Sequence, residues 1–287
     1  MLGIEVKRDR PKRKLYSSQQ EYIEQVLSRF GMEQSKPVTT PMERLSSKST
    51  SESSEPAPQG TPYRHAIGSL IYLVTGSRPD IAFAVSRLSK YLESPLQSHW
   101  IAVKRVLRYP AGTRKHAICY DGTRGIEVKG YSDSDYAGCI ETRKSTSGYI
   151  FLIAGGAVSW KSKKQTNTAT STCEAEYMAC CTATKEADWL SRLLADIRGL
   201  DMPEPISIGI HNAGTIYLAG NPANNERSKH IDVQYHFVRE CVDSNKINLR
   251  HCNTDDQLAD SLTKPLERIK HSKFTKLQGL MTCDSHS

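Results

Sequence analysis

The amino-acid sequence predicts an α/β protein with a mixed sheet in its second half and a mainly helical first half. From about residue 126, three short alternating segments follow one another with brief Gly-containing connections, and helical patterns then alternate with two further strands. Consecutive hairpin strands form the antiparallel part of such a sheet, and crossover helices lead to the parallel part. With 287 residues, 38% of them hydrophobic, the chain can form about two domains with a sizeable core.

The composition favours a polyanionic partner, because 39 Lys and Arg outnumber 31 Asp and Glu. No run of about 18 apolar residues occurs, and the N-terminus lacks the apolar core of a signal peptide. We therefore expect an intracellular protein that does not span a membrane. The eight cysteines show neither C-x-x-C pairs nor zinc-type spacing, and Cys180 and Cys181 are expected to be packing residues.

The first half is predicted from helical periodicity and composition. Residues 15–32 place apolar side chains three and four positions apart, and Ser17 or Ser18 can cap this helix. Residues 44–61 are Ser-rich and contain almost no large apolar residue, which predicts a flexible linker.

A second helical region extends from Ala66 to Tyr109. Breaks are predicted at Arg78-Pro79 and Ser94-Pro95, because proline interrupts a helix. Pro110 should end the last of these helices early. We expect a small helical bundle.

The second half is predicted element by element from the switch between alternating and helical patterns. The elements are strands at 125–132, 147–153 and 157–163, a helix at 174–197, a strand at 206–210, helical turns at 214–220 and 230–243, a strand at 247–251, and a last helix that opens with a capping box at Thr254 and Gln257.

Acidic residues stand where this order of elements would bring them together. Asp133 and Asp135 follow the first strand, Glu174 and Glu176 begin the long helix, and Asp260 lies in the last helix. Hard Mg²⁺ ions take oxygen ligands, and hydrolysis of a phosphodiester by two metal ions needs several convergent carboxylates. Their joint placement predicts a metal-dependent nuclease site, although each acid alone would suit a solvated surface or a helix start.

Several segments carry a specific resemblance. The sequences GYSDSDYAG, RKSTSGYIF, GGAVSWKSKKQ, STCEAEYMA, NERSKHIDVQYHFVRE and DQLADSLTKPL resemble the ribonuclease H domain of copia-type LTR retrotransposon Pol polyproteins. Upstream, LGIEV, SSQQEYIEQVLSRFGM, TTPM and YRHAIGSLIYLVTGSRPDIAFAVSRLSKYLESP resemble the part of the same family's reverse transcriptase that follows its palm. The resemblance implies a ribonuclease H-like mixed sheet. It divides the chain into a reverse-transcriptase part at 1–122, a ribonuclease H-like domain at 123–270 and a tail at 271–287.

The resemblance also implies site residues. The family's first catalytic Asp falls on Asp133, with Asp135 as a weaker alternative, and its Glu falls on Glu176, with Glu174 less favoured. Its last Asp falls on Asp260. These residues would hold two Mg²⁺ or Mn²⁺ ions that hydrolyse the RNA strand of an RNA/DNA hybrid.

At one position the chain departs from the family pattern. Where the family reads Asp-Asn after a strand, this sequence reads His211-Asn212, and no nearby acid restores the Asp by a slipped register. Neutral imidazole is a poor ligand for Mg²⁺ and suits softer ions such as Mn²⁺ better. We expect weakened metal binding and strongly reduced or absent hydrolysis in Mg²⁺.

Basic and aromatic residues are candidates for contact with nucleic acid. They are Arg143, Lys144, Trp160, Lys161, Lys163, Lys164, Arg227 and Lys229. Trp160 can equally lie in the core with its lysines outside, and Arg227 and Lys229 can cap the following helix. The basic run at 7–14 has a hairpin-like position and suits either a phosphate backbone or a solvated turn.

Three functions remain open from the sequence. The chain can be a ribonuclease of the ribonuclease H type, a module that binds nucleic acid without cleaving it, or an inert remnant. Because the resemblance places the polymerase's catalytic aspartates before residue 1, we expect no independent DNA synthesis, and a palm-bearing segment becomes a possible partner. The resemblance implies a cytoplasmic particle or the nucleus.

Overall fold

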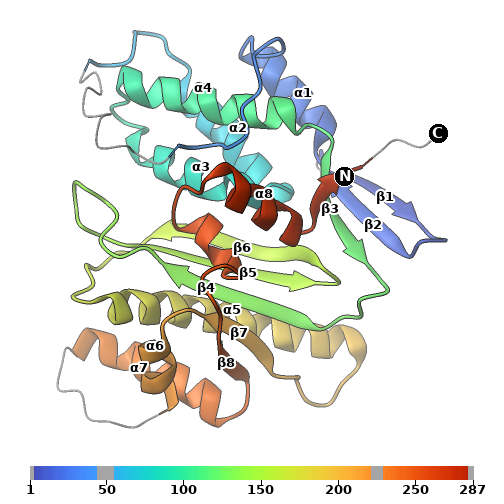
Figure 1. Ribbon diagram of the computed structural model, residues 1–287, viewed down its shortest axis with the longest axis vertical. Helices are drawn as coiled ribbons and strands as arrows, with labels where there is room; N and C mark the ends of the chain where they lie inside the picture. Colours follow the sequence, from blue (N-terminus) through green and yellow to red (C-terminus); the bar gives the residue numbers. More distant parts are fainter. Residues whose placement is uncertain (1–2, 44–54, 221–228, 284–287) are drawn as a thin grey trace. The chain divides into compact units, whose positions relative to one another are not determined.

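The chain forms two compact units in a computed structural model that describes residues 3–43, 55–220 and 229–283, with only the backbone at 229–232 (Figure 1). The first unit comprises Met1–Gly125, Ala154–Ala157 and Lys264–Ser287, and the second comprises Ile126–Ile153 and Val158–Thr263. The units divide after residue 125, against the expected boundary after 122. Within the described ranges, no helix combines the length and the apolar character needed to cross a membrane.

The first unit contains an antiparallel sheet of order β1-β2-β3-β9. Its strands are β1 (Glu5–Asp9), β2 (Lys14–Ser18), β3 (His116–Asp121) and β9 (Leu280–Thr282). The basic run at 7–14 spans the β1–β2 hairpin, as its position predicted. The expected cap at Ser17 or Ser18 is wrong, because both residues pair within β2 and Gln19 takes the N-cap position. The side chain of Gln19 instead accepts a hydrogen bond from the Ser77 hydroxyl at 2.8 Å.

Helices form the apolar core of the first unit. They are α1 (Gln20–Arg29), α2 (Tyr63–Gly76), η1 (Pro79–Ile81), α3 (Ala82–Leu88), η2 (Ser89–Tyr91), α4 (Gln97–Gly112) and α8 (Arg268–Leu277). Both predicted proline breaks are present. Pro110, however, lies inside α4 and does not end it. It sits in the last turn, where its missing N–H costs a single hydrogen bond, and its carbonyl still accepts from Thr113 N–H at 3.0 Å.

Two expected loose segments take part in the first unit. Most of the predicted linker, 44–54, lies outside the described residues, but at its end Glu55 O accepts the N–H of Gln97 at 2.9 Å. The expected tail at 271–287 contains most of α8 and all of β9, and β9 pairs with β3. A short helix followed by a three-residue strand is too brief to stand out from periodicity alone.

The second unit contains a mixed sheet of order β6-β5-β4-β7-β8. Its strands are β4 (Val128–Ser134), β5 (Thr146–Ile153), β6 (Gly156–Lys164), β7 (Ile206–Ile210) and β8 (Ile247–His251). The first two residues of β6, Gly156 and Ala157, belong to the first unit. Strand β4 runs antiparallel to β5 and parallel to β7, and β7 runs parallel to β8. The predicted fold class is confirmed by this arrangement of three meander strands followed by parallel strands.

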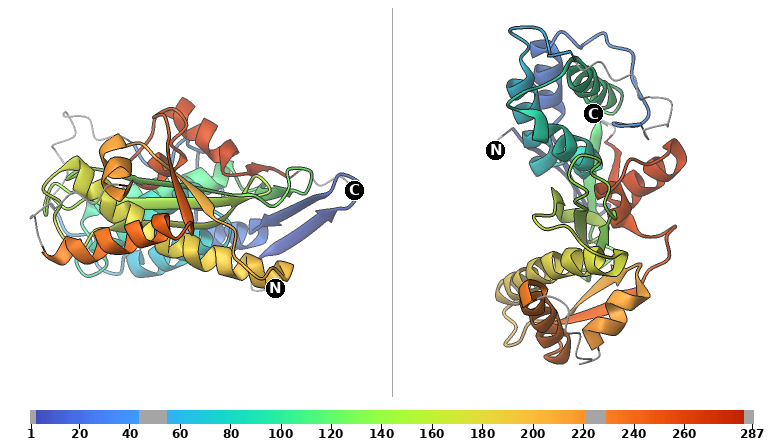
Figure 2. Two further views of the ribbon diagram at one scale, coloured as in Figure 1. Left: turned by 90° about the horizontal axis from the view of Figure 1, so that it is seen from below. Right: turned by 90° about the vertical axis from the view of Figure 1, so that its left-hand side faces the viewer.

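Helix α5 (Thr172–Arg198) packs against β4, β5 and β7 and lies along one face of the sheet (Figure 2). The Ser171 hydroxyl caps its start by accepting from Glu174 N–H, and Gly199, at φ 63°, ends it in the left-handed conformation. Cys180 and Cys181 are buried in the core of this unit, as predicted.

The remaining helices of the second unit are α6 (Ala213–Gly220), α7 (Lys229–Asp243) and η3 (Leu258–Leu262). The predicted last helix is only the single 3-10 turn η3, and its N-cap is Gln257, whose side chain accepts from Ala259 N–H. The capping box at Thr254 is therefore wrong. Pro265 follows closely and prevents η3 from continuing as a helix.

Candidate active site

Parallel pairing of β4 with β7 creates the edge at which the candidate residues lie. Ser132 on β4 is opposite Ile210 on β7, so the residues that come next, Asp133 and His211, stand at the same end of the sheet. Asp133 is buried and His211 is exposed. The carboxyl ends of parallel strands are where open α/β sheets place their functional side chains.

Asp133 and Asp260 are connected through Thr263. The Thr263 hydroxyl donates to Oδ2 of Asp133 and also lies 3.3 Å from the carbonyl oxygen of Asp260. All three residues are at most 3% exposed. The end of β4 and the turn η3 are therefore held together by hydrogen bonds in a water-poor environment, where such bonds are strongest.

The second predicted acid, Glu176, lies near the start of α5 and is 6% exposed. Its rival Glu174 is committed to the preceding loop, because its Oε2 accepts the N–H of Thr170 at 2.7 Å and the Thr170 hydroxyl. Asp135 is committed in a similar way, since its Oδ1 accepts the N–H of Thr146. Both alternative acids, Asp135 and Glu174, therefore accept hydrogen bonds from backbone N–H groups beside loops.

Two further residues shape this edge, and the sequence had not indicated this role for either of them. Nε2 of Gln257 donates to Ser132 O at 3.1 Å and to Gly209 O at 3.3 Å, which joins the ends of β4 and β7. Gly148 on β5 is opposite Asp133, and a Cβ there would lie 2.7 Å from Leu262 Cβ. Only glycine leaves room for η3 at this point.

A spacing in the sequence could have revealed part of this arrangement. Gln257, Asp260 and Thr263 recur every third residue in the segment QLADSLT. A 3-10 turn has three residues per turn, so side chains three apart eclipse one another. All three are buried.

The His211 ring is held by the segment that follows β8. Its Nδ1 lies 3.3 Å from the carbonyl oxygen of Cys252, and the Thr254 hydroxyl lies 3.4 Å from Nδ1 and 3.3 Å from Nε2. The ring of His251 is 6.1 Å away. Next in the chain, Asn212 Oδ1 accepts the N–H of Thr215 at 3.1 Å at the start of α6.

The candidate acids have the chemistry of metal ligands, and their spacing decides whether they can share an ion. Carboxylates such as Asp133, Glu176 and Asp260 are the oxygen ligands that Mg²⁺ prefers. In the part of the chain that the structure describes, however, no three His, Cys, Asp or Glu side chains are grouped closely enough to hold an ion. The donors therefore have the chemistry that suits Mg²⁺, and the three carboxylates would have to come closer together to share an ion.

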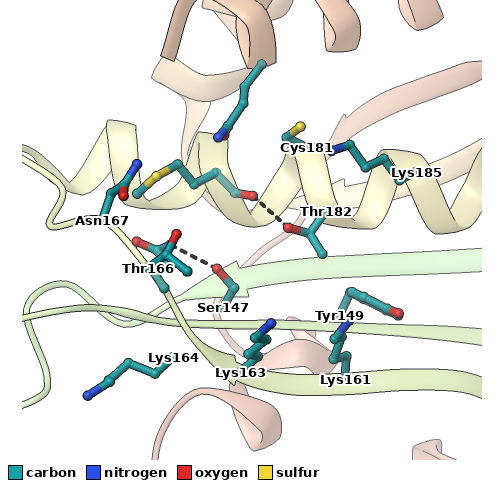
Figure 3. Close-up of a pocket in the computed structure, with 13 residues that line it drawn as sticks. Ser147, Tyr149, Lys161, Lys163, Lys164, Thr166, Asn167, Cys181, Thr182 and Lys185 are labelled. Carbon is teal, nitrogen blue, oxygen red and sulfur yellow. Dashed lines mark hydrogen bonds between the residues drawn. The ribbon is translucent and has the colours of Figure 1, made fainter. Parts of the chain in front are cut away.

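Three of the predicted basic residues gather at one pocket. Lys161, Lys163 and Lys164 line a pocket of about 190 Å³ together with Lys185 of α5 (Figure 3). Gln165 also lines it, and its buried Nε2 donates to Ser147 Oγ at 2.9 Å and to Ala175 O at 2.9 Å. Trp160 is half-buried and lies outside the lining.

The other predicted contacts are less concentrated. Lys144 donates to the carbonyl oxygen of Thr166 at 2.5 Å, which ties the β4–β5 loop to the segment after β6. Arg143 is exposed and adopts φ 52°, while its backbone N–H donates to Cys139 O at 2.7 Å. Arg227 and the side chain of Lys229 lie outside the described residues.

Comparison with known proteins gives the family. No protein-family model matches the chain. The chain is 42% identical over 285 residues to the "Retrovirus-related Pol polyprotein from transposon TNT 1-94" of Nicotiana tabacum, which covers 98% of this chain and 21% of that protein. The protein belongs to the copia-type retrotransposon Pol polyproteins. This Pol segment is also 41% identical over 280 residues to the polyprotein of transposon RE2 of Arabidopsis thaliana, covering 98% of the segment and 19% of the relative. The segment thus spans about a fifth of the length of these relatives.

Among solved structures, the Pol segment is similar to LC11-RNase H1, which was crystallised in complex with an RNA/DNA hybrid. The match has 14% sequence identity and a TM-score of 0.36, and it covers 48% of the segment and 94% of that chain.

Proposed function

We propose that the second unit of the Pol segment is a ribonuclease H-like domain that binds RNA/DNA hybrids and hydrolyses their RNA strand poorly in Mg²⁺. The observation that carries this proposal is the β4–β7 pairing, which puts an imidazole, His211, beside Asp133 where the family resemblance implies a carboxylate. Family membership supports the fold and the substrate class.

In this proposal Asp133, Glu176 and Asp260 are the metal ligands, and the cofactor is a pair of Mg²⁺ or Mn²⁺ ions. Asp135 and Glu174 are set aside because their carboxylates accept backbone hydrogen bonds in loops. The missing carboxylate removes one negative charge from the site.

A second candidate function is binding without cleavage, and the pocket at β6 and α5 favours it. Lys161, Lys163, Lys164 and Lys185 present four ammonium groups around one pocket. The acid nearest to them in the sequence, Glu186, accepts hydrogen bonds from Tyr149 and Ser159. A positively charged groove can hold a phosphate backbone whether or not the chemistry is intact.

For the first unit we propose a palm-bearing reverse-transcriptase segment as partner. The support is the resemblance of residues 1–122 to the part of the family's reverse transcriptase that follows its palm.

Cleavage of a labelled RNA/DNA hybrid tests the proposed chemistry. The unmodified chain, His211→Asp and Asp133→Asn are compared in Mg²⁺ and in Mn²⁺. We expect His211→Asp to create or greatly raise a cleavage that the additional change Asp133→Asn abolishes. Efficient cleavage in Mg²⁺ by the unmodified chain would show that our interpretation of His211 is wrong.

A matched control separates ligand position from added charge. His251 is also exposed, and its ring is 6.1 Å from that of His211. His251→Asp therefore adds the same negative charge close by without placing it after β7. If His251→Asp raises cleavage as much as His211→Asp does, the site needs only negative charge and not a ligand at position 211.

Hybrid affinity measured against salt concentration tests the binding function. Replacing Lys161, Lys163 and Lys164 by Ala should weaken binding and reduce the magnitude of the salt slope by about one for each phosphate that is no longer neutralised. Lys129→Ala is the control, because this exposed lysine lies on β4 and pairs with Glu127. If the triple variant and Lys129→Ala lose the same hybrid affinity, the pocket has no special role in binding.

A further inference from the structure

The C-terminal half of α5 exposes large apolar side chains. Trp189 is 55% exposed, Leu193 37% and Ile197 70%. Side chains four residues apart share one face of a helix, so these three form a stripe about 12 Å long. Leu200 and Met202, just past the end of the helix, continue it at 37% and 76% exposure. We call these five residues the α5 stripe.

This stripe is separate from the face of α5 that packs on the sheet. Ala187, Leu190 and Ala195 point into the core and are at most 5% exposed. A surface helix normally presents mainly polar residues to solvent, whereas this half of α5 exposes Trp189, Leu193 and Ile197 beside its polar residues. Contiguous exposed apolar side chains mark interaction surfaces, and a partly exposed Trp is a typical interface anchor. In Figure 2 (left) the gold C-terminal end of α5 lies at the periphery of its unit.

Charges along the stripe indicate which partner fits it. Arg192 and Asp196 are both exposed and border the same side of the stripe. When two copies of α5 pack antiparallel about a twofold axis near Leu193, equal sides face each other. Position 189 then lies opposite position 197 of the other copy, and position 192 lies within about 3 Å, along the helix axis, of position 196 of the other copy. Opposite charges thus face each other across the axis, so the stripe is complementary to itself in charge.

We propose that the α5 stripe is the surface through which two copies of this chain form a twofold dimer. Trp189 packs on Ile197 of the partner subunit, and Arg192 pairs with Asp196 of the partner subunit on either side of the axis. Within one chain Arg192, whose side chain is 63% exposed, contacts Asp188, whose side chain is 18% exposed, so in the dimer Arg192 lies between two carboxylates. This inference does not depend on nuclease activity.

Sedimentation velocity of the full chain, from micromolar to submillimolar concentration, tests the dimer. We expect a monomer–dimer equilibrium that Ile197→Lys weakens by about tenfold or more, as expected for a central interface residue. Ile140→Lys is the matched control, because Ile140 belongs to the same unit and is 72% exposed against 70% for Ile197. It should leave the association unchanged.

A charge exchange tests the twofold geometry. Arg192→Asp and Asp196→Arg should each weaken the dimer, and the double variant should restore it, because the opposite charges meet again across the axis. The proposal is overturned if the chain stays monomeric at every concentration. It is equally overturned if Ile197→Lys and Ile140→Lys act alike, or if the double variant fails to recover association. Amide-exchange protection of the stripe in a stable monomer would show that another part of the chain covers it.

Discussion

The hydroxyl of Thr263 donates a hydrogen bond to the carboxylate of Asp133, which lies 130 residues earlier in the chain. Thr263 is fully buried, and Asp133 is 3% exposed. The bond therefore connects the end of β4 to the turn η3 at the edge where the candidate acids lie.

Replacing Thr263 tests this connection. Thr263→Val keeps the shape but removes the donor, so it should lower the free energy of unfolding by about 1–3 kcal/mol. Thr263→Ser keeps the hydroxyl and should lower the free energy of unfolding by less. Urea denaturation measures both. Thr184→Val is the control, because the hydroxyl of this buried threonine has a weak hydrogen-bond partner among the described residues, the Cys180 sulfur at 4.0 Å. Similar losses for Val and Ser at position 263 would argue against the hydrogen bond.

Gly148→Ala is expected to push η3 away from β5. The added Cβ would lie 2.7 Å from Leu262 Cβ and 2.8 Å from Thr263 Cγ2. Overpacking of this kind costs about 1–3 kcal/mol, measured by urea denaturation. Gly220→Ala in α6 is the matched change, since nothing lies within 4 Å of its added Cβ. If both variants unfold at the same urea concentration, the close contact at Gly148 has no energetic role.

In the first unit, Arg78 and Asp80 form a buried ion pair whose side chains are both 0% exposed, with Nη2 and Oδ2 2.8 Å apart. Burial raises the pKa of Asp80, but the Arg78 guanidinium more than offsets this, so the pKa lies below its ordinary value. Arg78→Ala leaves the carboxylate buried without its guanidinium partner, and we expect a loss of about 3–5 kcal/mol in urea denaturation. The double variant Arg78→Ala with Asp80→Ala should lose less than the sum of the two single losses. If the loss of the double variant equals the sum of the two single losses, Arg78 and Asp80 are not energetically coupled.

A fall in pH should destabilise the first unit already at values above those at which Asp and Glu side chains take up protons. Burial lowers the pKa of His271 and of His116, so the unfolded chain binds protons more readily than the folded chain. This contribution to stability is complete above the unfolded value of about 6.5 and is lost as the pH falls below it. Thermal denaturation at about pH 7.5 and about pH 5.5 should show a lower Tm at the acidic value.

His271→Gln provides the control for this pH dependence. Nε2 of His271 lies 3.3 Å from the carbonyl oxygen of Asp80, and a Gln amide can donate to the same oxygen without titrating in this range. The Tm of this variant should therefore depend less on pH than that of the unmodified chain. An unchanged slope would show that His271 does not contribute to it.

Local patterns predicted the second unit well. Strands β7 and β8 occupy the predicted residues 206–210 and 247–251, because short apolar runs bounded by polar turns define them without help from the rest of the chain. The break at Arg78-Pro79 was found for a similar reason, since proline acts on its own backbone.

Features that depend on distant partners were not found. Strand β3 is held between β2 and β9, which come from opposite ends of the sequence, so no nearby hairpin reveals it. Gln257 and Gly148 matter through neighbours more than 100 residues away in the chain, Ser132 and Leu262 respectively. The metal-ligand roles of Asp133, Glu176 and Asp260 stay predictions, because side-chain identity alone does not determine how closely the acids approach one another.

The return of Lys264–Ser287 to the first unit makes the two units nested, with the second inserted into the first as a guest in a host. A premature stop codon after Thr263 would leave every residue of the guest in place, yet it would remove α8 and β9 from the host. Loss of the last residues of the chain therefore damages the part that is made first. For the same reason, cutting the chain once cannot separate the two units intact, and expressing the host alone requires its distant segments to be rejoined.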